Sequence, residues 1–219
     1  YSTLDQINTG NVANLKVAWM HSMGSVLSQE TAPLIIDGVL YASTSSGPAY
    51  VFALDAVTGD TIWSHQPDMP DDYHSIVCCG EANRGVAYSN GRIFFGRLDA
   101  ILVALDAKTG EELWQTEVKA YQDGYSITVP PIIVGDKVIV GHSGGEYGVR
   151  GSVQAYDQAS GELIWRHYNI PGPGEEGNET WKGDSWKVGG GTAWLYFTHD
   201  PDLNLIYFGT SNGAPWGGQ

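Results

Sequence analysis

A motif that recurs every 51 residues constrains the fold of this chain more than any other feature. It runs Ala-Leu-Asp-Ala-Val-Thr-Gly-Asp-Thr-Ile-Trp at 53–63 and returns at 104–114 and 155–165 with its Asp, Gly and Trp in register. A degenerate earlier copy ends at Trp19. A fixed period of this length is typical of architectures that repeat one supersecondary unit.

Each copy of the motif predicts two strands joined by a tight turn. The aspartate, as at Asp55, can cap the turn, and the glycine, as at Gly59, can adopt the left-handed backbone conformation. The tryptophan returns on the second strand, where its large area can pack against the neighbouring unit. The repeat therefore predicts units that dock on one another.

Further strand pairs lie between these copies. Alternating apolar residues flank Asp-Gly in 34–41, Asn-Gly in 86–95 and Gly-Asp in 132–140, and 194–208 shows a weaker pattern. Such turns between apolar runs are strong hairpin signals. Four strands per period predict an all-β β-propeller of four-stranded blades with tryptophan-docking repeats. A β-sandwich is the alternative that coincidental turns would allow.

About four blades fit in 219 residues. We expect the chain to be a piece of a longer propeller, and a closed four-bladed ring is the alternative. The N-terminal residues, Tyr1-Ser-Thr-Leu-Asp, read as the interior of a domain, so a signal peptide is expected outside this chain.

Composition excludes two classes of function. The net charge is −14, whereas nucleic-acid binding needs a basic face for the phosphates. No apolar run approaches the ~18 residues of a membrane span. The sequence therefore predicts neither nucleic-acid binding nor a membrane-spanning segment.

The two cysteines, Cys78 and Cys79, are neighbours in sequence. A disulfide between them would close almost no loop, so it would add little stability by restricting the unfolded chain. Adjacent Cα atoms lie ~3.8 Å apart, closer than the ~4.4–6.8 Å of ordinary disulfides. A bonded pair would therefore be strained, and strain points to a functional site. The alternative is two reduced cysteines packed as small apolar side chains.

Several long stretches resemble one known family. They are 29–33, 78–85 (Cys-Cys-Gly-Glu-Ala-Asn-Arg-Gly), 141–151, 181–194 and 209–216. In these stretches the chain resembles the quinoprotein alcohol dehydrogenases of the methanol and ethanol dehydrogenase type, which carry pyrroloquinoline quinone (PQQ) in an eight-bladed propeller. The resemblance implies that residues 1–219 form about half of such a propeller, with the remainder outside the chain.

The resemblance also implies a cofactor site. Cys78 and Cys79 would form a vicinal disulfide on one face of the quinone, and Trp194 would cover the other face, because a flat conjugated molecule favours two flat apolar covers. Arg84 would pair with a cofactor carboxylate, and Glu30 would hydrogen-bond nearby. The remaining cofactor residues would be hydroxyl donors or glycines that allow close approach: Thr128, Ser143, Gly144, Gly145 and Thr192.

The same resemblance implies a metal site and a base. Glu146 and Asn212 would offer oxygen ligands suited to Ca²⁺, with a lanthanide also open. The general base would be an Asp in a later blade, beyond Gln219. Asp184 and Asp200 do not match its position, and Asp200-Pro-Asp202 is expected to form a hairpin turn.

The implied function is oxidation of a primary or secondary alcohol to the aldehyde or ketone, by hydride transfer to metal-activated quinone. Electrons would pass to a cytochrome c or quinone acceptor, in the periplasm of a bacterium, and an oligomer is left open. Two alternatives remain. One is a non-catalytic propeller that serves as a protein-binding scaffold, which has no need for the cysteine pair, Glu146 or Asn212. The other is a quinoprotein that acts on sugars or polyols.

Overall fold

The computed structural model describes residues 3–25, 27 and 29–214. Its regular elements are short strands and 3-10 helices, and within this described part no helix is long and apolar enough to cross a membrane. The 3-10 helices are η1 (Val12–Asn14), η2 (Tyr73–Ile76), η3 (Tyr121–Asp123), η4 (Gly145–Tyr147), η5 (Asn178–Thr180) and η6 (Ser185–Val188).

The strands form three four-stranded antiparallel sheets and one hairpin, each in sequence order. The first sheet contains β1 (Leu34–Ile36), β2 (Val39–Ser43), β3 (Val51–Asp55) and β4 (Thr61–His65). The second contains β5 (Ala87–Ser89), β6 (Arg92–Gly96), β7 (Ile101–Asp106) and β8 (Glu112–Glu117). The third contains β9 (Ile132–Val134), β10 (Lys137–Val140), β11 (Ser152–Asp157) and β12 (Leu163–Tyr168), and the hairpin is β13 (Thr198–Asp200) with β14 (Leu205–Tyr207).

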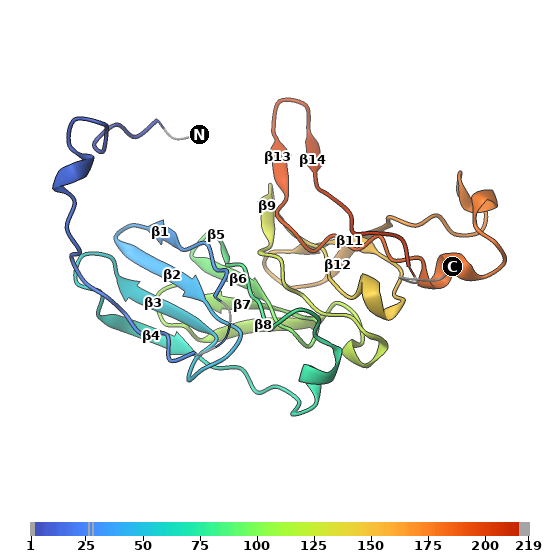
Figure 1. Cartoon of the computed structure of the whole chain (residues 1–219), viewed down its shortest axis with the longest axis horizontal. Helices are drawn as coiled ribbons and strands as arrows, with labels where there is room; N and C mark the ends of the chain where they lie inside the picture. The colour runs from blue at the N-terminus through green and yellow to red at the C-terminus, as the bar shows by residue number, and fades with distance from the viewer. Residues whose placement is uncertain (1–2, 26, 28, 215–219) are drawn as a thin grey trace.

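These sheets confirm the predicted all-β propeller architecture. They follow one another across the molecule, and the β13–β14 hairpin rises beside β9 of the third sheet (Figure 1). The four predicted hairpins are all present. The described residues thus hold three complete blades and two strands of another, and the last part of the 209–216 motif, including Trp216, lies outside them.

Each recurring aspartate caps its own turn, as the sequence predicts. Oδ1 of Asp106 accepts hydrogen bonds from the backbone N–H groups of Lys108 and Thr109, both at 2.9 Å. The Thr109 N–H is the main cause that holds the pKa of Asp106 below its usual value. Asp55 and Asp157 make the equivalent bonds.

The recurring tryptophans join each sheet to the next one. The Trp63 indole Nε1 of the first sheet donates to the Ala107 carbonyl of the second at 3.0 Å, and Trp114 Nε1 donates to the Gln158 carbonyl of the third at 3.1 Å. Trp19 makes the same bond to the Ala56 carbonyl at 3.2 Å, although residues 15–25 form no strand. The degenerate copy therefore keeps the docking contact without the strand.

The core lies between the sheets, because the central strands β3, β7 and β11 are buried on both of their faces. On β6, Ile93 and Phe95 pack with Tyr41 of β2 and with Tyr50, which directly precedes β3. Phe94, between them in sequence, packs with residues of the third sheet such as Tyr156. This alternation is the two-residue period of a strand whose faces both contact neighbouring sheets.

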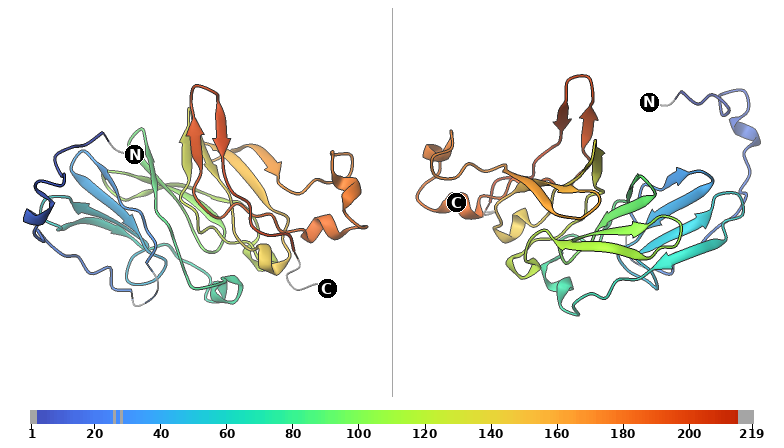
Figure 2. Two further views of the ribbon diagram at one scale, coloured as in Figure 1. Left: turned by 45° about the horizontal axis from the view of Figure 1, so that its top comes forward. Right: turned by 180° about the vertical axis from the view of Figure 1, so that it is seen from behind.

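The first strand of each sheet is its innermost strand, and these strands bring distant segments of the chain side by side. β5 contacts β9, and β9 contacts β13. Just before these strands, Ala32 N donates to the Arg84 carbonyl at 3.1 Å and Arg84 N donates to the Thr128 carbonyl at 3.2 Å. The two further views show the same succession of sheets (Figure 2). The entrances to the innermost strands therefore meet at one place.

We predict that the docking contact leaves no room for a methyl group at the turn glycine. A Cβ on Gly110, where φ is +75°, would lie 2.7 Å from the Trp63 ring. Gly110→Ala should lower the free energy of unfolding by about 1–3 kcal/mol more than Gly91→Ala, the range typical of overpacking. Gly91 is the matched control, because its φ is +73° and no atom lies within 4 Å of its Cβ position.

Urea denaturation of the full-length protein and its two variants measures this difference. Equal losses for the two alanines would show that the tryptophan contact is loose, in contradiction to the docking described above.

Candidate functional site

One pocket lies where the entrances to the innermost strands meet. It is lined by residues that the chain supplies from five separate segments, between 77 and 212. The lining residues are Val77, Cys78, Cys79, Gly80, Ala82, Arg84, Thr128, Ser143, Glu146, Trp194, Ser211 and Asn212. The structure thus brings eight of the twelve predicted site residues to one cavity: Cys78, Cys79, Arg84, Thr128, Ser143, Glu146, Trp194 and Asn212.

Cys78 and Cys79 form a disulfide in this pocket. Of the two states that the sequence left open, the structure has the bonded one. Cys79 has φ of +66°, a left-handed conformation that is uncommon for a residue with a side chain. The pair follows η2 in the long connection between β4 and β5, so a loop and not a strand carries it.

Arg84 is the cation of the pocket. Its side chain is 11% exposed and its Nη2 lies 2.7 Å from Oε2 of Glu30. The guanidinium also stacks 5.0 Å from the centroid of the Trp194 ring, and Nη1 donates to the Thr128 carbonyl at 3.3 Å. Glu30 therefore touches the site through Arg84, as a partly exposed counter-charge at the rim.

Arg84 is held in place by the buried amide of its neighbour. Asn83 is 2% exposed, and its Oδ1 accepts from Ser43 Oγ at 2.5 Å and from Gly85 N at 3.1 Å. Its Nδ2 donates to the Gly96 carbonyl at 2.7 Å. Because all three bonds are buried, they fix the backbone on both sides of Arg84 between the first and second sheets.

The hydroxyl groups of the pocket are anchored on backbone carbonyls. Thr128 Oγ1 donates to the Trp194 carbonyl at 3.4 Å, and Ser143 Oγ donates to the Ser126 carbonyl at 3.0 Å. Each oxygen keeps lone pairs, and each proton can turn to another acceptor. Behind Ser143, the buried His142 has its pKa lowered to about 4 by burial, so its imidazole is neutral at neutral pH.

Three of the predicted residues lie behind the pocket wall. Thr192 Oγ1 donates to Ser211 Oγ at 3.0 Å, and a Cβ on Gly145 would lie 2.8 Å from that same serine oxygen. Gly144 has φ of +106°, and a Cβ there would meet the Gly124 carbonyl oxygen. The close approach that both glycines allow is therefore one between segments of the chain itself.

The sequence did not single out Ser211, which lines the pocket and orders its wall. Ser211 accepts hydrogen bonds from Thr192 N at 3.0 Å and from Thr192 Oγ1. The available signal was its position directly before Asn212. Val77, Gly80 and Ala82 were also missed, because small residues without a polar side chain carry no distinctive pattern beside or within a motif.

Glu146 and Asn212 reach the pocket from η4 and from the segment after β14. Within the described residues, no three His, Cys, Asp or Glu side chains group together as a metal cluster. A cation in this pocket would therefore rely on one carboxylate together with amide and hydroxyl oxygens, a donor set that fits a hard cation.

The two aspartates that the sequence analysis set aside as bases lie elsewhere. Asp184 pairs with Lys187 at 2.7 Å, beside η6. Asp200 caps the β13–β14 turn, where its Oδ1 accepts from Asp202 N and Leu203 N at 3.0 Å. This confirms the predicted hairpin turn at Asp200-Pro-Asp202. Among the described residues, no Asp lines the pocket.

All 219 residues match the family model described as "PQQ: Glucose/ethanol/alcohol dehydrogenase, beta-propeller domain". The chain belongs to this family of PQQ dehydrogenase propellers. The family membership and the resemblance drawn from the sequence motifs agree.

Curated relatives and solved structures of the PQQ dehydrogenases match along the whole chain. The lanthanide-dependent methanol dehydrogenase of Methylacidiphilum fumariolicum is 41% identical, over 100% of this chain and 39% of the relative. Methanol dehydrogenase [cytochrome c] subunit 1 of Methylorubrum extorquens is 42% identical, over 99% of this chain and 38% of the relative. The solved structure of a europium-containing methanol dehydrogenase is 40% identical with a TM-score of 0.90, over 99% of this chain and 41% of that chain. The chain thus spans about two fifths of the relatives it matches.

We predict that the buried amide of Asn83 is a principal support of the site. Asn83→Ala leaves Ser43 Oγ, Gly85 N and the Gly96 carbonyl without their partner, so it should cost about 2–4 kcal/mol of unfolding free energy. Asn14→Ala, at an exposed position of η1, is the matched control and should change stability by less than about 0.5 kcal/mol.

Thermal or urea denaturation of the full-length protein compares the two variants. A cost for Asn83→Ala as small as that of Asn14→Ala would show that the three buried hydrogen bonds do not support the joint between the sheets.

Proposed function

We propose that the protein that contains this chain is a PQQ-dependent alcohol dehydrogenase whose quinone lies between the Cys78–Cys79 disulfide and Trp194. The observation that carries this proposal is the pocket itself. It joins a disulfide, an indole ring and a guanidinium from separate parts of the chain. A flat ring system with carboxylates has apolar faces and anionic edges, and these groups match both.

The residues of this chain bind and orient the cofactor in this proposal. Cys78, Cys79 and Trp194 exclude water from the faces of the ring system. Arg84 pairs with a cofactor carboxylate, and Glu30 balances the charge of that arginine at the rim. Hydrogen bonds from Thr128 and Ser143 fix the edge, and Thr192 supports it from behind through Ser211 Oγ, while Gly144 and Gly145 let the surrounding segments approach one another.

Glu146 and Asn212 would hold the metal ion, either Ca²⁺ or a lanthanide, and one relative's name includes a dependence on lanthanide. When bound, the metal and the quinone together supply a polarised carbonyl that accepts hydride from the alcohol. The general base stays a prediction for an Asp beyond Gln219.

The substrate class, acceptor and compartment follow from the family and from the disulfide. We propose a primary or secondary alcohol as substrate and a cytochrome c or quinone as acceptor, and one relative is named for its cytochrome c. A Cys78–Cys79 disulfide requires an oxidising compartment, which supports the bacterial periplasm. Three alternatives stay open to experiment. The substrate can be a sugar or polyol, the protein can form an oligomer, and the propeller can serve as a protein-binding scaffold.

We predict that removal of the Glu146 charge lowers metal-dependent activity strongly. Full-length apo-protein is titrated with PQQ in the presence of Ca²⁺ or La³⁺, and dye reduction with ethanol is measured. Glu146→Gln should lower the rate at least tenfold, because the only carboxylate that lines the pocket among the described residues becomes neutral. Glu162→Gln, in an exposed turn, is the control and should keep the wild-type rate.

The titration also decides between the proposed classes. Cofactor-dependent oxidation of ethanol supports the alcohol dehydrogenase, and oxidation of glucose or glycerol alone would replace the alcohol by a sugar or polyol. A folded wild-type protein that binds no PQQ would overturn the proposal in favour of the scaffold.

A further inference from the structure

The disulfide lies in the second half of a long connection with little regular structure of its own. Residues 66–86 join β4 to β5, and the only helix or strand within them is η2. A bond between adjacent cysteines closes no long loop, so it does not tether this connection to the rest of the fold. The position of the disulfide in the pocket must therefore depend on non-covalent contacts elsewhere in the connection.

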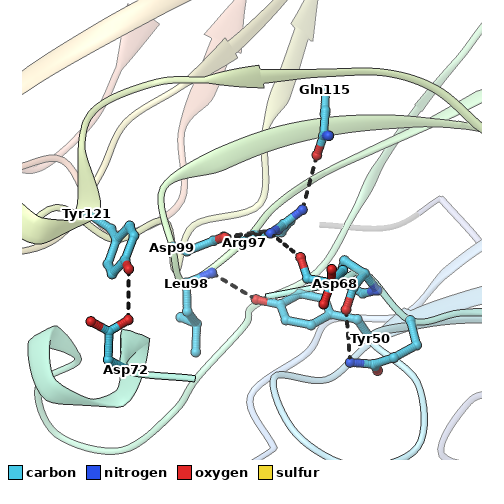
Figure 3. Close-up of polar contacts among 10 residues, drawn as sticks. Tyr50, Asp68, Asp72, Arg97, Leu98, Asp99, Gln115 and Tyr121 are labelled. Atoms are coloured by element: carbon cyan, nitrogen blue, oxygen red, sulfur yellow. Dashed lines mark hydrogen bonds and ion pairs between the residues drawn. The ribbon is translucent and has the colours of Figure 1, made fainter. Parts of the chain in front are cut away.

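One such contact comes from Arg97, in the turn between β6 and β7. Its Nη2 donates to the Asp68 carbonyl at 2.7 Å, near the start of the connection (Figure 3). Arg97 and Asp99 are 5% and 4% exposed, and Arg97 Nε donates to Asp99 Oδ1 at 2.9 Å. Nη1 donates to Gln115 Oε1 at 3.1 Å. The guanidinium is thus fixed on three sides.

A second contact comes from Tyr121 in η3. Its hydroxyl donates to Asp72 Oδ1 at 2.7 Å, directly before η2 (Figure 3). The hydrogen bond to Asp72 raises the pKa of the Tyr121 hydroxyl, as expected when the phenol donates to a carboxylate. Arg97 and Tyr121 both belong to the second sheet and the segment that follows it, which gives the connection two points of attachment on one support.

The far side of the disulfide is closed by Glu81. Its carboxylate accepts from the Tyr73 hydroxyl at 2.9 Å and pairs with His74 Nδ1. Ser45 Oγ donates to the Glu81 carbonyl. The contacts of Tyr73 and His74 bind η2 to the residues after the cysteines, so η2 and the disulfide should move as one unit, and Ser45 joins Glu81 to the loop that follows β2.

We propose that Arg97 and Tyr121 are positioning residues that hold this unit, and with it the disulfide, across the pocket from Trp194. A buried ion pair such as Arg97–Asp99 adds little net stability, because desolvation offsets the attraction. The ion pair does, however, hold the Arg97 guanidinium in a fixed orientation, from which it donates to the Asp68 carbonyl of the connection. The consequence for quinone binding rests on the function proposed above, whereas the anchoring itself does not.

The rate at which a phosphine reduces the disulfide of the full-length apo-protein tests the anchoring. Alkylation of the released thiols and mass spectrometry follow the reaction well below the unfolding temperature. Tyr121→Phe and Asp72→Ala should each raise the rate about fivefold, the factor that corresponds to one hydrogen bond of about 1 kcal/mol. The double variant should be no faster than either single one, because both remove the same bond.

Arg97→Lys is the second test, since it keeps the charge beside Asp99 but cannot reach Asp68 and Gln115 at once. It should also speed reduction. Tyr207→Phe, an exposed position on β14, is the matched control and should leave the rate unchanged. The affinity for PQQ should fall in the same variants in which the disulfide is reduced faster. The midpoint of unfolding of Tyr121→Phe should stay close to that of the wild-type protein.

Unchanged reduction rates in Tyr121→Phe and Arg97→Lys would overturn the anchoring. Faster reduction with unchanged PQQ affinity would overturn the positioning role, because the place of the disulfide would then not matter to the site. If the wild-type protein binds no PQQ, the function proposed above fails, while the reduction rates still decide whether these residues anchor the disulfide.

Discussion

The packing of each tryptophan on the turn of the next sheet is the interaction on which the rest of the structure depends. A four-stranded sheet with two apolar faces cannot stay folded alone, because it must cover both faces with other sheets. The indole of Trp63 or Trp114 lies on a glycine of the next sheet and donates to the carbonyl beside the capped turn. This contact fixes how one sheet is placed on another, at the edge remote from the pocket.

The placement of the sheets in turn builds the site. Because the innermost strands contact one another, Arg84, Thr128 and Trp194 meet although they are distant in sequence. Buried polar groups complete the joints: Asn83 joins the first and second sheets, and Ser211 ties the last described segment to Thr192. The disulfide is the exception, since no strand carries it and the anchors that we propose for it reach out from the second sheet and from the segment that follows it.

The sequence predicted most of the fold, because the repeat encodes it in local terms. The period, the turn residues and the alternation of apolar residues indicate the sheets and their hairpins without knowledge of distant contacts. The contribution of Trp19 was only partly visible, since it docks from a segment without a strand. The site was predicted chiefly through motifs shared with a known family, and the pocket contains eight of those residues.

The remaining features could not be predicted for a physical reason. Ser211, Asn83 and the Arg97–Asp99 pair act through contacts between segments far apart in the chain, and a serine or arginine in a turn has no periodicity to reveal them. Likewise, the glycine pair at Gly144 and Gly145 looked like a place for close approach to a ligand. In the structure a Cβ on Gly144 would meet the Gly124 carbonyl oxygen and one on Gly145 would meet Ser211 Oγ, so both glycines let segments of the chain pack closely beside the pocket.

The central claim is that a pocket at the joints of the propeller holds a flat quinone between the disulfide and an indole. A crystal structure of the full-length protein with PQQ and Ca²⁺ tests this most directly. The account predicts density for the ring system between Cys78–Cys79 and Trp194, with a carboxylate at Arg84 and the cation at Glu146 and Asn212. Quinone density at another place, with this pocket filled only by water, would contradict it.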